Sequence, residues 1–310
     1  MRLDVEVGAA DAGGRLDAFL VRGVEELSRA RARAAIAEGR VLVNGRVTTR
    51  GGTTLRAGDR VVLTEAPPSP SFLPAPPDGS VVLVVAHLDA RFVVVDKPAG
   101  VPTHPLRPDE AATLANALLG RFPEMAGVGY ASREPGIVHR LDNETSGLVL
   151  AARDAETFER LRAALTAGEI DKRYEILVEG ALDPGLRSID APIANHPRDR
   201  RRVVAYLEAA PEGARAARTE VLATEAVGPF TRVEVRASTA TRHQIRAHFA
   251  AIGRPLVGDA RYGGRHREGL GRHYLHAMAL ALRHPFTGDA LTITAPRPPE
   301  LERFLREAVR

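Results

Sequence analysis

Six prolines between residues 66 and 80 constrain the fold of this chain more than any other local feature. Proline has no backbone N–H and a fixed φ, so a segment this rich in proline forms neither a helix nor a central strand. The sequence therefore predicts a stiff extended linker at 66–80. It divides the chain into a small domain, 1–65, and a large domain, 81–310. The prolines are Pro67, Pro68, Pro70, Pro74, Pro76 and Pro77.

Composition limits the chemistry that these domains can carry. With 310 residues and 44% hydrophobic content, the chain can build a full globular core. Cysteine is absent, which excludes disulfides, thiolate metal sites and cysteine nucleophiles. The longest apolar runs, such as 81–86, are too short to span a membrane, and residues 1–10 lack the apolar centre of a signal peptide. We therefore expect a cytoplasmic protein with no membrane association.

The charge balance suits a polyanionic partner without requiring one. The net charge is +4 and the sequence pI about 9.8. All but Lys97 and Lys172 of the 43 basic residues are arginines, whose planar guanidinium binds phosphate bidentately. A genome that favours arginine codons explains the same bias, so the charge alone leaves both interpretations open.

The small domain is predicted to form a helical hairpin followed by strands. Apolar residues at 16, 19 and 20 mark one amphipathic turn, and Ser28 caps a second helix that ends at Gly39. The pair Asn44-Gly45 predicts a hairpin between strands at 41–43 and 46–48, with a further strand at 61–63. The exposed face of the second helix carries Arg29, Arg31 and Arg33.

These residues resemble the small α/β RNA-binding domain first described in a small-subunit ribosomal protein. The resemblance implies that the three arginines contact RNA, whereas a solvated helix face is the alternative interpretation. The motifs that carry it follow in order: Arg15-Leu-Asp17, Ser28-Arg29, Gly39, Val43-Asn-Gly45 and Gly58-Asp59.

The large domain mixes short β-rich runs with helices in irregular alternation. This order favours an α+β domain, a mixed and largely antiparallel sheet with flanking helices, over a regular βαβ repeat. The predicted strands are 81–85, 92–95, 147–151, 174–179, 232–235 and 291–294. The predicted helices are 109–119, 154–165, 241–252 and 299–308.

The densest motif runs from Val138 to Leu150 and consists of an apolar strand, a polar loop, a glycine and a second apolar strand. Asp142 lies in the loop, where two buried strands would hold it rigidly while it faces a cleft. That placement suits a nucleophile or general base. Aspartates in turns more often bond backbone amides, so from the residues alone both interpretations remain open.

His139-Arg-Leu-Asp142 followed by Thr145-Ser-Gly147 resembles the catalytic motif of the RluA family of pseudouridine synthases. The resemblance extends over roughly residues 80 to 300. Further matching motifs follow in order: Asp96-Lys-Pro-Ala-Gly100, Lys172-Arg-Tyr174, Pro192-Ile193, His196-Pro197, Asp199-Arg200, His243-Gln-Ile-Arg246, Gly258-Asp259, Tyr262-Gly263 and His276-Ala277. One departure stands at Ala240-Thr241, where the family commonly has Gly-Arg.

The resemblance implies a reaction that breaks the bond from uracil nitrogen 1 to ribose and rejoins the base through carbon 5. It requires no metal, redox cofactor or nucleotide. Asp142 would be the nucleophile at the anomeric carbon or at carbon 6, or would stabilise a charged intermediate. Tyr174 would lie against the base, Arg246 would keep Asp142 ionised, and Arg140 would occupy the space of the flipped nucleotide. The remaining RNA contacts would be Arg200, Arg202, His243 and Gln244.

The predicted elements make two of these roles geometrically testable. Tyr174 would share the apolar face of its strand with Ile176 and Val178. Arg246 would lie near the start of the 241–252 helix, where the helix dipole favours an anion. The histidines include no His-Glu-x-x-His pattern, so we expect no metal site.

Large-subunit ribosomal RNA is the expected substrate of a monomeric enzyme, by analogy with family members of this architecture, and transfer RNA is the second candidate. Two other classes remain: a non-catalytic RNA-binding protein on the same fold, and an aspartate-dependent hydrolase. The hydrolase would need a second carboxylate beside Asp142, for which Glu144 is the nearest candidate in sequence.

Overall fold

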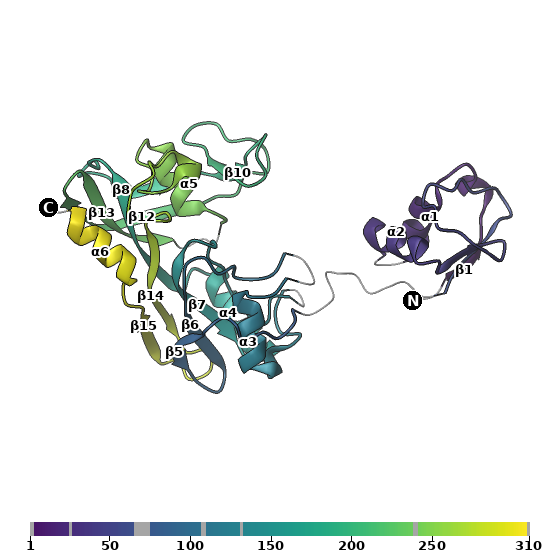
Figure 1. Ribbon diagram of the computed structural model, residues 1–310, viewed down its shortest axis with the longest axis horizontal. Helices are drawn as coiled ribbons and strands as arrows, with labels where there is room; N and C mark the ends of the chain where they lie inside the picture. The colour runs from purple at the N-terminus through teal and green to yellow at the C-terminus, as the bar shows by residue number, and fades with distance from the viewer. Residues whose placement is uncertain are drawn as a thin grey trace. The chain divides into compact units, whose positions relative to one another are not determined.

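A computed structural model describes residues 3–24, 27–64, 75–106, 110–130, 133–237 and 241–308. The chain divides into two compact units, 1–73 and 74–310 (Figure 1). Most of the predicted linker, 66–74, lies outside the described residues. From Ala75 onward, however, this segment packs on the second unit, because Ala75 is buried and Asn116 Nδ2 donates to the Pro76 carbonyl at 2.7 Å.

The first unit is a small antiparallel sheet packed against two helices. Its strand order is β1-β4-β2-β3, and α1 and α2 contribute the apolar residues that cover the sheet. The left-handed backbone of Asn44 and Gly45 forms the predicted hairpin turn. The elements are β1 Leu3–Glu6, η1 Ala9–Asp11, α1 Leu16–Gly23, α2 Arg29–Ala37, β2 Val41–Val43, β3 Arg46–Val47 and β4 Arg60–Leu63.

Helix α2 corrects the prediction for Arg31. Arg29 and Arg33, one turn apart, are exposed, but Arg31 is buried. Arg31 and Ala35 are also one turn apart and lie on the side of the helix that faces the core. The exposed basic face of this helix therefore consists of Arg29 and Arg33, without Arg31.

A nine-stranded mixed sheet organises the second unit. The order is β5-β6-β7-β14-β8-β13-β12-β9, with β15 paired to β14, and of the pairings only β7 with β14 is parallel within the described residues. The predicted α+β class is confirmed. The strands are β5 Val84–Leu88, β6 Phe92–Lys97, β7 Ser146–Ala152, β8 Asp171–Glu179, β9 Ser188–Asp190, β12 Arg218–Val227, β13 Phe230–Ala237, β14 Leu275–Arg283 and β15 Ala290–Thr294; β10 Ile193–Asn195 and β11 Val203–Ala205 form a separate hairpin.

Helices cover both faces of this sheet. Helices α3 and α5 pack on the face that carries Tyr174, Ile176 and Val178, while α4 and α6 pack on the opposite face with Leu177. Figure 1 shows α5 beside the β10–β11 hairpin. None of the helices in the described parts of the chain is long and apolar enough to cross a membrane. The helices are α3 Leu114–Arg121, η3 Pro123–Met125, α4 Ala155–Thr166, α5 Gln244–Ala251, η4 Ala260–Tyr262 and α6 Pro299–Ala308.

Several predicted elements begin three or more residues away from their predicted starts. Helix α5, expected from 241, begins at Gln244, and β8, expected from 174, begins at Asp171. The helix expected at 109–119 begins at Leu114, because Ala112 is left-handed with φ of 57° and Thr113 forms a capping box with Asn116. Residue 109 lies outside the described residues. The strand expected at 81–85 is β5, Val84–Leu88, and its pairing with β6 shifts register between Val85 and His87.

The parallel contact between β7 and β14 requires a glycine. Gly147 has φ of 115°, and a Cβ at this position would lie 2.3 Å from the Ala277 carbonyl oxygen. Any side chain would push the two strands apart. This contact fixes the start of β7, and the loop that carries Asp142 ends there.

Candidate active site

The backbone on both sides of Asp142 is held by buried side chains. Thr103 Oγ1 donates to the Leu141 carbonyl at 2.7 Å and accepts from the Leu141 N–H at 3.2 Å. The Asn143 carbonyl accepts from Gly100 N at 2.8 Å and from Lys97 Nζ at 3.1 Å. The loop around Asp142 is therefore fixed by residues from the 97–103 segment.

The downstream half of the loop is anchored from β14 and the residues before it. Arg272 donates to the Glu144 carbonyl and to Ser146 Oγ, each at 2.9 Å. The buried hydroxyl of Thr145 lies 2.8 Å from His273 Nε2. Such a closed set of bonds preorganises the loop, so that the position of the Asp142 carboxylate depends on its own partners.

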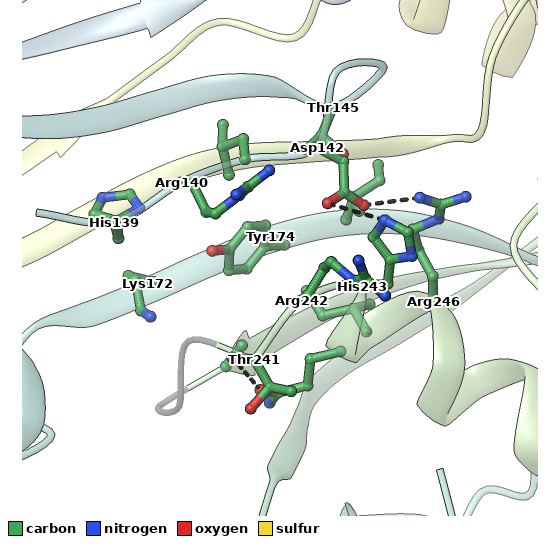
Figure 2. A pocket seen from close by; sticks show the side chains of 15 residues that line it. His139, Arg140, Asp142, Thr145, Lys172, Tyr174, Thr241, Arg242, His243 and Arg246 are labelled. Atoms are coloured by element: carbon green, nitrogen blue, oxygen red, sulfur yellow. Dashed lines mark hydrogen bonds and ion pairs between the residues drawn. The ribbon is translucent and has the colours of Figure 1, made fainter. Parts of the chain in front are cut away.

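Arg246 is the main partner of Asp142. Its Nη1 donates to Asp142 Oδ2 at 2.8 Å, and Figure 2 shows the two side chains meeting at the pocket wall. The remaining guanidinium nitrogens bind Asp259 bidentately, at 2.7 Å and 2.8 Å. Because Asp259 is buried and fixes the guanidinium plane, Arg246 presents one N–H to Asp142 in a set orientation. Arg246 is the third residue of α5, which confirms its predicted place near the helix start.

The electrostatics of the pair keep Asp142 ionised. Burial raises the pKa of Asp142, but the neighbouring His243 and the charge and hydrogen bond of Arg246 lower it, and the net pKa lies below the ordinary value. Burial lowers the pKa of Arg246, but its interactions with Asp259 and Asp142 raise it by more. The net pKa of Arg246 therefore lies above its ordinary value. At neutral pH the site therefore contains a carboxylate held by a permanent cation in a mostly buried position.

Tyr174 forms one wall of the cavity beside Asp142. About 570 Å³ of empty space, part of it open to solvent, lies between the loop, β8 and the start of α5. The Tyr174 ring shares the predicted apolar face of β8, and Figure 2 shows its hydroxyl turned away from the Asp142 carboxylate. Burial and the charge of Asp142 raise the pKa of Tyr174, so its hydroxyl is protonated at neutral pH.

The predicted RNA contacts separate into two groups. Arg140 lines the same cavity, with Nη1 3.0 Å from His104 Nε2. Arg200 is exposed on the β10–β11 loop, and Arg202 lies half-buried with its guanidinium carbon 5.2 Å from the centre of the Tyr262 ring.

Gln244 does not fit the predicted RNA contact. It is buried, and its Nε2 donates to the Arg218 carbonyl at 2.9 Å and to Thr219 Oγ1 at 3.3 Å. Because its amide is used to anchor α5 to β12, we correct its role to a structural one. His243, by contrast, lies beside Asp142 and Tyr262.

Several residues of the site were not singled out from the sequence. Thr103, Arg272 and His273 bind the Asp142 loop from distant parts of the chain, and spacing alone gives no signal for such contacts. Lys97 did give a signal in the sequence, since it is one of two lysines in the chain. Its ammonium is fully buried, and burial lowers the pKa of Lys97 to about 7. Among the described residues, no group of three or more histidine or acidic side chains could hold a metal ion.

Asp142, its partner Arg246 and Tyr174 line one pocket of a domain that matches an RNA pseudouridine synthase family. The chain belongs to this family: the RNA pseudouridylate synthase family matches residues 91–251, and the S4 domain family matches residues 14–61.

Relatives of similar length support the assignment. An uncharacterized RNA pseudouridine synthase of Chloroflexus aurantiacus is 40% identical over 94% of this chain and 89% of its own length. The ribosomal large subunit pseudouridine synthase D of Xanthomonas campestris is 36% identical over 95% of this chain and 88% of its own. The structure of human RNA pseudouridylate synthase domain containing 1 has the same fold, with a TM-score of 0.56 and 24% identity over 75% of this chain and 96% of that one.

Proposed function

We propose that this protein converts uridine to pseudouridine in large-subunit ribosomal RNA, with Asp142 as the nucleophile. The observation that carries the chemical part is the ion pair between the partly buried Asp142 and the buried Arg246, which Asp259 fixes from behind, at the wall of a pocket that also contains Tyr174. Support for the substrate comes from the relatives named ribosomal large subunit pseudouridine synthase D and from the S4 domain match.

The reaction is an isomerisation and its atoms balance without a co-reactant. The bond from uracil N1 to the ribose anomeric carbon breaks, a bond from C5 to the same carbon forms, and the proton lost from C5 is matched by one gained at N1. Asp142 supplies the anionic group that attacks the nucleotide, and Arg246 keeps it ionised in the water-poor pocket. Tyr174 stacks against the base, and because its hydroxyl is protonated it can donate a hydrogen bond while Asp142 is charged.

Substrate access requires the uridine to leave its stack, since a paired base cannot reach the pocket. We assign Arg140, at the pocket mouth, to the space of the displaced nucleotide. Arg200 and Arg202 on the β10–β11 loop contact phosphates, as do Arg29 and Arg33 in a separable RNA-binding domain, residues 1–65. A linker over 66–80 would join it to a catalytic domain of residues 81–310, with the part from Ala75 docked on that domain, and the enzyme would act as a monomer.

A hydrolase is less well supported by this geometry. Asp259 is the carboxylate that shares a partner with Asp142, and Arg246 binds both of its oxygens. Glu144 is exposed, and its backbone carbonyl is the group that anchors the loop. Because both of its oxygens bind Arg246, Asp259 is not placed to activate a water beside Asp142.

The test is chemical mapping of pseudouridine in ribosomal and transfer RNA from cells with and without the gene, followed by conversion of the affected RNA by purified protein. We expect sites in large-subunit ribosomal RNA to depend on the gene. Asp142→Asn should abolish conversion with RNA affinity retained, while Asp183→Asn, an exposed aspartate far from the pocket residues, should convert normally. Dependence of transfer RNA sites alone would refute the substrate, and an active Asp142→Asn protein would refute the nucleophile.

A further inference from the structure

His243 stands between a tyrosine hydroxyl and the reactive carboxylate. Its Nδ1 lies 2.9 Å from the Tyr262 hydroxyl, and its Nε2 lies 3.6 Å from Asp142 Oδ1. Figure 2 shows its ring beside the Asp142 carboxylate, on the pocket side of Arg246. Arg246 holds the other carboxylate oxygen, Oδ2, so each oxygen of Asp142 faces a different side chain.

The hydrogen bonds of Tyr262 determine which nitrogen of His243 carries the proton. The Tyr262 hydroxyl oxygen accepts from the Val203 N–H at 3.0 Å. Its single proton needs an acceptor, and within the described residues the acceptor in reach is His243 Nδ1. The proton of a neutral His243 is then on Nε2, which points to Asp142 Oδ1.

His243 is neutral in this environment. Burial lowers the pKa of His243 to about 4, and although the Asp142 charge raises it, Arg246 and Arg242 lower it again. A neutral ring can donate one hydrogen bond to Asp142 without giving it a full proton. The 3.6 Å separation exceeds a formed hydrogen bond by a few tenths of an ångström, a gap that catalytic groups close when substrate binds.

The backbone at His243 is held in a costly conformation to place this ring. His243 caps α5 with φ of 54° and ψ of 20°, a left-handed geometry that is uncommon in residues other than glycine, although histidine adopts it more often than most. The ring packs edge-on against Tyr262, with centroids 5.7 Å apart and an interplanar angle of 89°. A strained backbone conformation persists where neighbouring residues hold it in place, and at His243 these neighbours are the partners of Asp142.

We propose that His243, oriented by Tyr262, is a positioning residue for the reaction and holds Asp142 Oδ1 while Arg246 holds Oδ2. With one donor on each oxygen, the carboxylate plane is fixed and a lone pair of Oδ1 faces the pocket. This replaces the RNA contact predicted for His243 from the sequence. The inference rests on the proposed function, because it gives His243 a role only if Asp142 is the reacting group.

The experiment compares four variants in single-turnover conversion of RNA with enzyme in excess, so that the rate at saturation and the RNA dissociation constant are measured separately. His243→Ala removes the donor. His243→Gln places an amide N–H near the position of Nε2. His243→Asn places its amide near Nδ1, too short to reach Asp142, and is the matched control because asparagine tolerates a left-handed backbone. Tyr262→Phe keeps the ring and removes the hydroxyl.

We expect the alanine and asparagine variants to lose roughly 10-fold to 100-fold in saturating rate, the effect of a reactive group misplaced by less than an ångström. Their dissociation constants should stay within about threefold of wild type, and the glutamine variant should recover most of the rate. The saturating rate of Tyr262→Phe should lie between that of the alanine variant and that of the glutamine variant.

A wild-type saturating rate in His243→Ala, or a loss confined to the dissociation constant, would overturn the inference and leave the proposed function intact. Equal losses in the asparagine and glutamine variants would do the same, since they would show a packing role. Failure of the wild-type protein to form pseudouridine would instead overturn the proposed function itself.

Discussion

Replacing Arg246 by glutamine tests the central electrostatic claim about the site. Glutamine keeps a polar side chain of similar length but removes the charge that opposes burial at Asp142. The guanidinium donates to Asp142 at 2.8 Å, and charge centres about 4 Å apart interact by about 4 kcal/mol at the effective dielectric of partly buried pairs. That energy corresponds to about three pKa units.

In Arg246→Gln, the acidic side of the pH profile of kcat/KM should therefore shift to higher pH. The pKa of Asp142 lies below its ordinary value in the wild type, because Arg246 opposes the effect of burial, and in Arg246→Gln the pKa should rise. The carboxylate of the variant is then protonated and inactive at the acidic end of the pH range, and its charge returns as the pH increases. We expect the ratio of wild-type to variant kcat/KM to fall by roughly 10-fold to 100-fold between pH 5 and pH 8, measured by tritium release from RNA labelled at uridine C5.

Stability provides the control for this variant. Arg246→Gln leaves two buried carboxylates without their cation, which should cost about 3–5 kcal/mol at neutral pH. Adding Asp259→Asn removes one of these charges and should restore much of the melting temperature. The double variant should nevertheless keep the shifted acid limb. A ratio of kcat/KM that does not change with pH in either variant would refute the claim that Arg246 keeps Asp142 ionised.

Two other outcomes follow from the fold. Deleting residues 1–64 should weaken RNA binding and make its dependence on salt shallower, because a basic unit that contacts phosphates would be lost; equal affinity at every salt concentration would remove the first unit from RNA recognition. Lys97→Met removes a group whose pKa is lowered to about 7. Because the unfolded chain binds that proton more tightly than the folded protein, wild type should gain about 2 kcal/mol over the variant between pH 7 and pH 9 in denaturant titrations, and parallel pH curves would contradict this.

Local patterns predicted the elements whose burial follows a simple period. Alternation along β8 correctly placed Tyr174 with Ile176 and Val178, and helical spacing correctly placed Arg246 near the start of a helix, although α5 begins three residues later than predicted. The central strand β14 was not predicted. Its sequence, Leu275-His-Ala-Met-Ala-Leu-Ala-Leu-Arg283, is composed mostly of helix formers. It is a strand because β8 and β7 bind its two edges, and tertiary pairing of that kind overrides local preference.

The supporting residues of the site could not be found from spacing. Arg272 binds the Glu144 carbonyl across 128 residues, and Lys97 binds the Asn143 carbonyl across 46. Only the folded sheet brings these segments together. The burial of Arg31 could not be predicted for a different reason. A helix rich in arginine and alanine has too little apolar pattern to indicate which arginine faces the core.

The contacts around Asp142 give a physical reason why the matching motifs recur together. Lys97 and Gly100 bind the backbone beside Asp142, Asp259 fixes Arg246, and Ala277 pairs with Gly147. These four motif fragments support the same loop, so a change in one of them would disturb the position of Asp142.

The departure at Ala240-Thr241 falls outside this set of contacts. Ala240 lies outside the described residues. Among the described residues, Thr241 bonds Gln244, with its N–H donating to Oε1 at 3.4 Å and its carbonyl accepting from the Gln244 N–H at 3.2 Å. Arg242, the arginine displaced by one position, donates to the Arg200 and Arg202 carbonyls at 3.0 Å and 3.1 Å. It therefore fastens the β10–β11 loop, which carries the proposed phosphate contacts, instead of the loop of Asp142. Replacing Ala240-Thr241 by Gly-Arg should change the RNA dissociation constant more than the saturating rate. The reason is that the altered segment supports the RNA-binding loop and not the Asp142 carboxylate.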